Sequence, residues 1–114
     1  MTVNERIIAA LKPEGFPVKP DLYDGQEDIF YTFNFDTRGE LFADDAPQCE
    51  VCLIQVHLTC PRRFDSVELR RRTVKRLFQA GFTYPEVTNA SDKDAQHYVF
   101  ECEWIEGVEA DGQI

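Results

Sequence analysis

The stretch Ile29-Phe30-Tyr31-Thr32-Phe33-Asn34-Phe35 decides the fold class. Its side chains alternate with the period of two that is typical of a β-strand. One side of this predicted strand has Ile29, Tyr31, Phe33 and Phe35, and the other side has Phe30, Thr32 and Asn34. Aromatic rings therefore occupy both faces, so that one face is available for a core and the second is a candidate contact surface.

Three further segments are predicted to be strands. The segment 50–59 alternates, and its apolar side is Cys52, Ile54, Val56, Leu58 and Cys60. The segment 97–105 alternates as well, and its apolar side is Tyr98, Phe100, Cys102 and Trp104. The Pro-containing passage 16–26 predicts an irregular edge strand through Val18, Leu22 and Tyr23, since proline within a sheet is confined to edges.

Two segments have the spacing of an amphipathic helix. In 4–12 the apolar residues are Ile7, Ile8 and Leu11, and Asn4 is the predicted N-cap. The second helix is predicted to begin at Asp65, with Glu68 completing a capping box, and to end before Gly81. Its predicted apolar stripe consists of Val67, Val74, Leu77 and Phe78.

The predicted order of elements is therefore α-β-β-β-α-β. This order is typical of an α+β domain in which a small antiparallel β-sheet, here of about four strands, carries two helices on one face. A chain of 114 residues fits a single domain, 1–114. We expect residues 107–114 to be a flexible acidic tail.

A predicted loop over 36–48 breaks the alternation with Gly39, Asp44, Asp45 and Pro47. It is longer than a tight hairpin needs. Long loops are often functional, so this loop is a candidate contact element.

Charge is distributed unevenly along the chain, whose formal net charge is −9. Residues 62–76 hold seven basic and two acidic residues, which gives +5, and the remaining five basic and nineteen acidic residues give −14. The acidic balance argues against nonspecific attraction of the whole molecule to nucleic acid. The basic cluster thus becomes the most informative charged feature.

Three interpretations of the basic cluster stay open. It is a solvated helix face, or it tracks the phosphates of a nucleic acid, or it meets the acidic face of a neighbouring identical subunit. Contacts of the last kind run head to tail and close into a ring when the rotation permits. The candidate subunit-interface residues are Arg70, Arg71, Arg72, Lys75 and Arg76.

No pattern in the sequence predicts catalysis, a cofactor or a metal site. Cys49-x-x-Cys52 invites a zinc or redox interpretation, but on a strand these two side chains point to opposite faces, and no second pair completes a tetrahedral set. We expect buried structural thiols, with Cys49 partly exposed. His57 is interpreted as a histidine on the sheet surface, and the acidic pairs as solvated. The glycines form no phosphate-binding loop.

The segment 1–12 has no long apolar core, and no run approaches the roughly 20 apolar residues of a membrane span. We therefore expect a cytoplasmic protein that contacts no membrane. Its four cysteines are expected to be reduced thiols, because disulfides persist mainly in oxidising compartments.

Several short motifs follow one another along the chain. The first half has a short helix and then Tyr23-Asp24-Gly25, Tyr31-Thr32-Phe33-Asn34-Phe35, Ala43-Asp44-Asp45-Ala46-Pro47 and Ile54-Gln55-Val56-His57-Leu58. The second half has Leu77-Phe78-Gln79-Ala80-Gly81-Phe82 and His97-Tyr98-Val99-Phe100-Glu101-Cys102-Glu103. This pattern resembles that of the tail terminator family, also called tail completion or head–tail joining proteins, of tailed bacteriophages and prophages.

The resemblance implies a non-enzymatic virion assembly protein. Such a subunit typically forms a hexameric ring at the head-proximal end of the tail tube, where it contacts the tail tube protein and the head–tail connector proteins. DNA passes through the ring without specific binding, and the protein moves from the cytoplasm of the bacterial host into the virion. The implied tube or connector contact residues are Thr37, Arg38, Glu40, Leu41, Phe42, Asp44 and Asp45.

Two alternatives stay open beside this expectation. The first is another head–tail connector or minor tail protein, because sequence likeness separates these roles poorly. The second is a small host regulatory or inhibitor domain that acts by protein binding.

Overall fold

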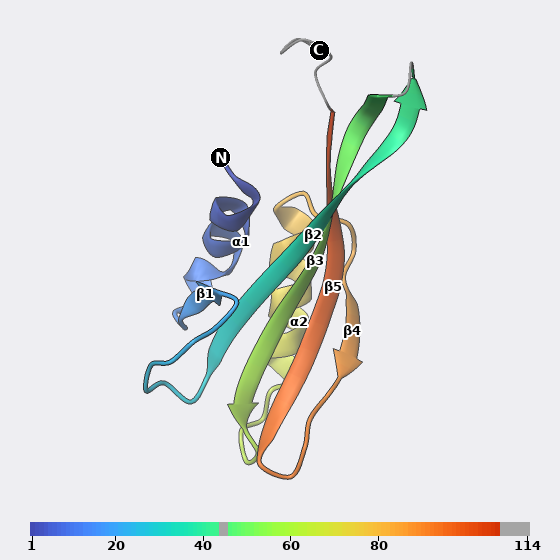
Figure 1. The fold of residues 1–114 in the computed structure, drawn as a ribbon. Coiled ribbons are helices and arrows are strands. Elements are labelled where there is room, and N and C mark those ends of the chain that lie inside the picture. Colours follow the sequence, from blue (N-terminus) through green and yellow to red (C-terminus); the bar gives the residue numbers. More distant parts are fainter. Residues whose placement is uncertain (44–45, 108–114) are drawn as a thin grey trace.

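A five-stranded sheet forms the centre of the molecule, with strand order β1-β2-β3-β5-β4 (Figure 1). The strands are β1 (Val18–Pro20), β2 (Phe30–Ala43), β3 (Ala46–Pro61), β4 (Glu86–Asn89) and β5 (Ala95–Gly107). β2, β3, β5 and β4 are antiparallel neighbours, whereas β1 runs parallel to β2. The computed structural model describes the backbone of residues 1–43 and 46–107, and their side chains except at 40–43, 46–48 and 107. The expected tail 107–114 thus falls, after its first residue, outside the described residues.

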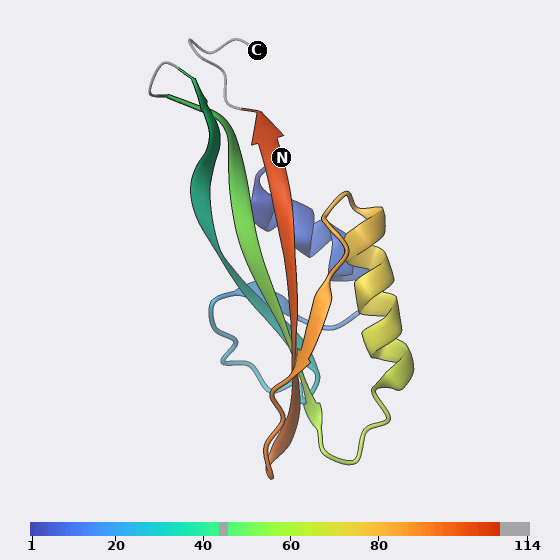
Figure 2. The same cartoon turned by 90° about the vertical axis from the view of Figure 1, so that its right-hand side faces the viewer.

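Both helices lie on one face of this sheet, which confirms the predicted α+β class. α1 (Val3–Leu11) continues into a short 3-10 helix, η1 (Lys12–Glu14), and α2 (Val67–Gln79) lies between β3 and β4 in the chain. Figure 2 shows α1 and α2 on the same side of the strands. The observed order is α-β-β-β-α-β-β, with one strand more than predicted.

The core lies between the helices and the face of the sheet that the alternation predicted. Its fully buried apolar side chains include Ile7, Leu11, Tyr31, Phe33, Ile54, Val56, Leu58, Leu69, Leu77 and Phe100. Burial of each such side chain contributes about 1.5–3 kcal/mol relative to exposure. The opposite face of the central strands is covered by no described helix, and we call it the open face.

One buried hydrogen bond ties the sheet to α2. The hydroxyl of Tyr31 lies 2.7 Å from Thr73 Oγ1, which in turn donates its proton to the carbonyl oxygen of Leu69 at 2.8 Å. Because a threonine hydroxyl has a single proton, Tyr31 is the donor of the first bond. Burial raises the pKa of Tyr31 to about 12, so this phenol keeps its proton.

α1 begins two residues earlier than its predicted cap suggests. Its N-cap is Thr2 rather than Asn4, and Thr2 forms a reciprocal capping box with Glu5. The Thr2 hydroxyl accepts from the Glu5 amide at 3.1 Å, while the Glu5 carboxylate accepts from the Thr2 amide at 2.9 Å. The hydrogen bonds from Thr2 lower the pKa of Glu5.

The predicted apolar stripe of α2 is partly wrong. The N-cap is Ser66 rather than Asp65, and the residues that α2 buries are Leu69, Thr73 and Leu77. These residues are spaced by four, so they form one stripe down the helix, whereas Val67 and Phe78 are exposed. The predicted end is confirmed, because Gly81 follows the C-cap in the left-handed conformation with φ 103°.

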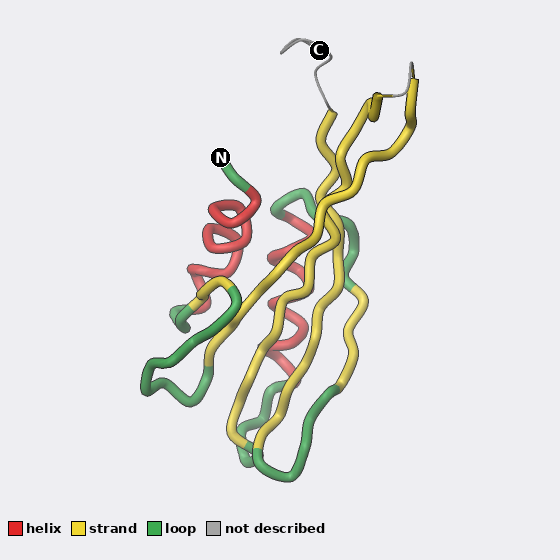
Figure 3. Tube along the Cα trace, viewed as in Figure 1, coloured by secondary structure: helices red, strands yellow, loops and turns green. Residues whose placement is uncertain are grey.

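The predicted loop over 36–48 is also wrong, because β2 and β3 continue through most of it as a hairpin (Figure 3). The pairing of these strands runs on to Ala43↔Ala46. Figure 1 shows this end of the hairpin beyond the helices. Its sequence is interrupted by Gly39, Asp44, Asp45 and Pro47 and has no apolar alternation, which explains why the pattern predicts no strand there.

Two edge strands complete the sheet. β1 is shorter than predicted, since it ends at Pro20, and Leu22 beyond it is exposed. β4 has no counterpart in the prediction: its four residues are all exposed, so burial imposes no alternation on them. Each edge strand adds only a short ladder to the three long central strands.

Candidate functional site

The five basic residues predicted as a subunit interface do not share one environment. Arg72 and Arg76 both form ion pairs with Glu14 of η1, in the first case at 3.0 Å. The Glu14 side chain is only 4% exposed, so a buried carboxylate binds the two partly exposed guanidinium groups. Burial raises the pKa of Glu14, but the hydrogen bonds from Arg76 and Arg72 outweigh it and hold the pKa below its ordinary value. These two arginines therefore fasten α2 to η1.

Arg70 also has partners within the chain. Its guanidinium group lies over the Tyr98 ring, 4.4 Å from the centroid, and its Nε donates to Ser66 Oγ at 3.1 Å. A cation over an aromatic face is an attractive contact. Three of the five predicted residues thus contribute to the fold, and fewer cations are left for phosphates than the sequence suggests.

Arg71 and Lys75 differ, because they line an outer surface of α2 together with apolar groups. We define the helix groove by Arg71, Val74, Lys75, Phe78 and Tyr84, which enclose about 350 Å³. Phe78 is 53% exposed and Tyr84 69%, and their rings meet edge to face with centroids 5.4 Å apart. Exposed aromatic rings beside cations are typical of protein contact surfaces.

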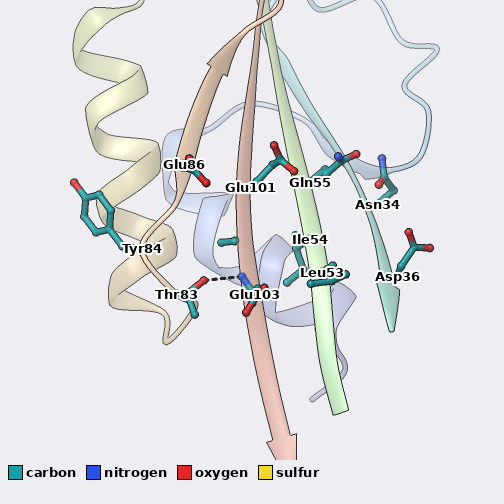
Figure 4. Close-up of a pocket in the computed structure, with 11 residues that line it drawn as sticks. Asn34, Asp36, Leu53, Ile54, Gln55, Thr83, Tyr84, Glu86, Glu101 and Glu103 are labelled. Carbon is teal, nitrogen blue, oxygen red and sulfur yellow. Dashed lines mark hydrogen bonds between the residues drawn. The ribbon is translucent and has the colours of Figure 1, made fainter. Parts of the chain in front are cut away.

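A second concave surface lies on the open face of the sheet (Figure 4). This sheet trough, of about 410 Å³, is lined by Asn34, Asp36, Leu53, Ile54, Gln55, Thr83, Tyr84, Glu86, Glu101, Cys102 and Glu103. Four of these residues are carboxylates, and none of the four forms an ion pair with another described residue. Glu86 and Glu101 are direct cross-strand partners, an arrangement that is destabilising for like charges. A cationic partner in the trough would relieve this repulsion.

The two histidines pair on the open face, which the sequence did not predict. His57 Nδ1 lies 2.8 Å from His97 Nε2, and Asn34 Nδ2 lies 3.5 Å from His57 Nε2. In the contact between the two rings, one ring nitrogen donates its proton and the other accepts it. Burial, and secondly the neighbouring His97, lower the pKa of His57. The sequence gives no signal for this pair, because cross-strand register alone brings the rings together.

Stability should therefore fall on mild acidification. The lowered folded-state pKa of His57 means that the unfolded chain binds this proton more tightly. We expect the free energy of unfolding to decrease as the pH falls below about 6.5, the ordinary histidine value, and to stop decreasing through this group below the folded-state pKa. Urea unfolding at a series of pH values measures this slope. The variant His57→Gln should have a flatter profile in this window, and an unchanged slope would contradict the assignment.

The cysteines occupy positions that suit packing. Cys52, Cys60 and Cys102 are free thiols buried on the core face, and Cys49 is partly exposed. Burial raises the pKa of Cys60 to about 11 and that of Cys102 to about 12, which leaves them protonated. Within the described part of the chain, no three histidine, cysteine or acidic side chains are grouped as metal ligands.

The predicted contact segment lies on the protruding end of the hairpin. We call residues 37–43 and 46–52 the hairpin arm. β5 pairs with β3 as far as Cys49↔Gly107, and beyond that point the described arm consists of two strands. Of the seven predicted contact residues, five belong to β2: Thr37, Arg38, Glu40, Leu41 and Phe42. The other two, Asp44 and Asp45, lie outside the described residues.

These features define a class: a small α+β domain with two helices on one face of a mostly antiparallel sheet and an open opposite face. Nine chains of known structure match this fold. One of them superimposes with a TM-score of 0.60 and 9% sequence identity, over 94% of this chain and 88% of its own. At that identity the likeness shows the fold alone. No protein-family model and no curated protein matches the sequence. None of the described helices is long and apolar enough to cross a membrane.

Proposed function

We propose that this chain is a non-enzymatic assembly protein of a tailed phage or prophage, of the tail terminator or tail completion type. It forms a ring at the head-proximal end of the tail tube, ends tube polymerisation and joins the tube to the head. The observation that carries the proposal is the hairpin arm, which stands beyond the helices where the resemblance implies a tube or connector contact (Figure 1).

The physical chemistry of the arm supports a contact role. A two-stranded ribbon is only marginally stable in water by itself and gains stability when it packs on another surface. Beyond Cys49↔Gly107, where the pairing of β3 with β5 ends, no third described strand borders this ribbon, so a further strand can be added there. The molecule is elongated, 54 Å against 25 and 22 Å, and the arm lies at one end of its long dimension (Figure 1).

The charge of the chain suits a ring through which DNA passes. At a net charge of −9 the subunit repels phosphate rather than binding it. The three arginines with intrachain partners reduce the positive charge left on α2. The protein assembles in the cytoplasm of the bacterial host and remains in the virion at the head–tail junction.

Shortening the arm tests this proposal. Gly39 and Glu50 are register partners, so a two-residue Asn-Gly turn can replace residues 40–49 and close the hairpin early. We expect the shortened protein to fold and keep its oligomeric mass, but to bind tubes of the tail protein from the same genome about 100-fold more weakly. Co-sedimentation measures binding, and electron microscopy shows whether added protein limits tube length.

A variant shortened at the opposite end of β2 is the matched control. In it, two glycines replace residues 24–27, and tube binding is expected to stay normal. The proposal is wrong if the full-length protein neither binds tubes nor limits their length, or if the arm-shortened variant does both as well as the full-length chain.

A further inference from the structure

The helix groove and the sheet trough lie on different sides of the molecule. The helix groove belongs to α2, which covers the core face of the sheet, while the trough is on the open face (Figures 2 and 4). Tyr84 lines both surfaces, so the two meet at the β4 edge. A contact between such unlike surfaces on two copies runs head to tail, and it closes into a ring when the rotation permits.

The charges of the two surfaces are complementary. The trough has four carboxylates without a cationic partner among the described residues, and two of them, Glu86 and Glu101, face each other. The helix groove has Arg71, whose only described ion pair is an exposed one with Glu68 at 3.2 Å, and Lys75, which has none in the described part of the chain. Exposed pairs such as Arg71–Glu68 are weak, so Arg71 can exchange partners at little cost.

The apolar components of the two surfaces are also complementary. The helix groove exposes Phe78 and Tyr84, and the trough has the half-buried Leu53 between its acidic side chains, while the neighbouring Ile54 is buried in the core. Aromatic anchors surrounded by charged groups are the usual composition of an interface hot spot. Exposed aromatic rings on one surface and facing carboxylates on the other are not typical of surfaces that contact only water.

We propose that the helix groove of one copy docks in the sheet trough of the next. In this contact Arg71 and Lys75 of one copy neutralise Glu101 and Glu103 of its neighbour, and Phe78 packs against the apolar part of the trough. The inference rests on the ring of the proposed function and names the surfaces that build it. The charge on the contact makes it weaken as the salt concentration rises.

Two charge-reversed variants test the contact. Arg71→Glu/Lys75→Glu makes the helix groove acidic, and Glu101→Lys/Glu103→Lys makes the trough basic. Each variant then opposes like charges, and we expect each to associate at least about 100-fold more weakly than the wild type at low salt. Sedimentation in about 50 mM salt reports the mass relative to the 13.2 kDa monomer.

Mixing the two variants is the decisive experiment. The acidic groove of the first then meets the basic trough of the second, and the normal groove of the second meets the normal trough of the first. Every contact between unlike copies is attractive, so the equimolar mixture is expected to recover, with alternating copies, the oligomer that neither variant forms alone. A chain with all four substitutions is expected to recover it too.

Matched controls separate the contact from net charge. Arg63→Glu/Lys93→Glu and Asp24→Lys/Glu27→Lys change the charge by the same amounts at exposed positions outside both surfaces, and they should associate normally. Far-ultraviolet circular dichroism and thermal unfolding show that each variant is folded, and Glu101→Gln/Glu103→Gln is a milder trough variant.

The outcomes also separate this inference from the proposed function. A wild type that stays monomeric at low salt, reversed variants that associate normally, or a mixture that stays monomeric would each overturn the contact. Reversed variants that associate normally, beside a wild type that caps tubes, would overturn the contact and leave the tube-capping role intact. Loss of association in the variants and its recovery in the mixture, beside a wild type that does not bind tubes, would support the contact and overturn the tube-capping role.

Discussion

Replacing Gln96 by leucine is expected to lower the free energy of unfolding by about 4 kcal/mol, a large part of the total stability of a domain this size. The Gln96 side chain is buried and binds on both of its ends. Its Oε1 accepts from Ser66 Oγ at 2.6 Å and from the Tyr98 hydroxyl at 3.0 Å. Its Nε2 donates to the carbonyl oxygens of Pro61 at 2.7 Å and Phe64 at 2.6 Å.

The size of this effect follows from the groups that leucine leaves without partners. Two hydroxyl donors and two carbonyl acceptors lose their hydrogen bonds, and each buried unsatisfied group costs about 1–3 kcal/mol. Because the turn between β3 and α2 is partly exposed and admits water, we take the lower end for each. The same bonds hold this turn against β5, so α2 should also lose its fixed starting point.

Urea unfolding followed by circular dichroism measures the change. Gln55→Leu is the matched control, since Gln55 lies on the neighbouring strand but is exposed on the open face. We expect the control to alter the free energy of unfolding by no more than about 0.5 kcal/mol. Equal effects of the two substitutions would show that the polar network does not stabilise the fold as argued.

Elements whose burial alternates could be predicted from the sequence, and elements without burial could not. The strands around Tyr31, Val56 and Phe100 each pack one side against the helices, so a period of two is written into their residues. The residues of β4 are all exposed, so no alternation is imposed on them. At the end of the hairpin, the sequence has polar residues, glycine and scattered apolar residues without alternation. The error in the apolar stripe of α2 has another origin. The rotation of the helix about its axis buries Leu69 and exposes Phe78, and the spacing of apolar residues does not fix that rotation.

The sequence predicts which residue types form the candidate site, but not how they are grouped in space. The basic cluster on α2 is visible in the sequence, but its division into Arg72 and Arg76, which bind Glu14, and Arg71 and Lys75, which line the helix groove, depends on tertiary contacts. The sheet trough is likewise a product of register. Glu86 is distant in the chain from Glu101 and Glu103, and strand pairing brings all three into one trough with Asp36, which lies across β3 from them.

Glu14→Gln is expected to lower the free energy of unfolding by about 2 kcal/mol at neutral pH. The carboxylate is almost fully buried and binds two guanidinium groups, which makes it the single polar link from η1 to Arg72 and Arg76 of α2 among the described contacts. Both arginines are partly exposed, at 50% and 33%, and water replaces some of what they lose. We therefore place the effect below that of breaking a fully buried ion pair.

The pH dependence distinguishes this ion-pair role from simple packing. The folded-state pKa of Glu14 is lowered, so its contribution is fully present above the ordinary value of 4.5 and is lost as the pH falls through the folded-state pKa. The difference between wild type and Glu14→Gln should shrink over this range, as measured by urea unfolding at each pH. Glu68→Gln is the matched control, because Glu68 pairs with Arg71 on the same helix while both side chains are at least 70% exposed. We expect that control to change the free energy of unfolding by less than about 0.5 kcal/mol at any pH. A difference for Glu14→Gln that did not vary with pH would assign its effect to shape rather than charge, and Arg72 and Arg76 would then be free to join the helix groove.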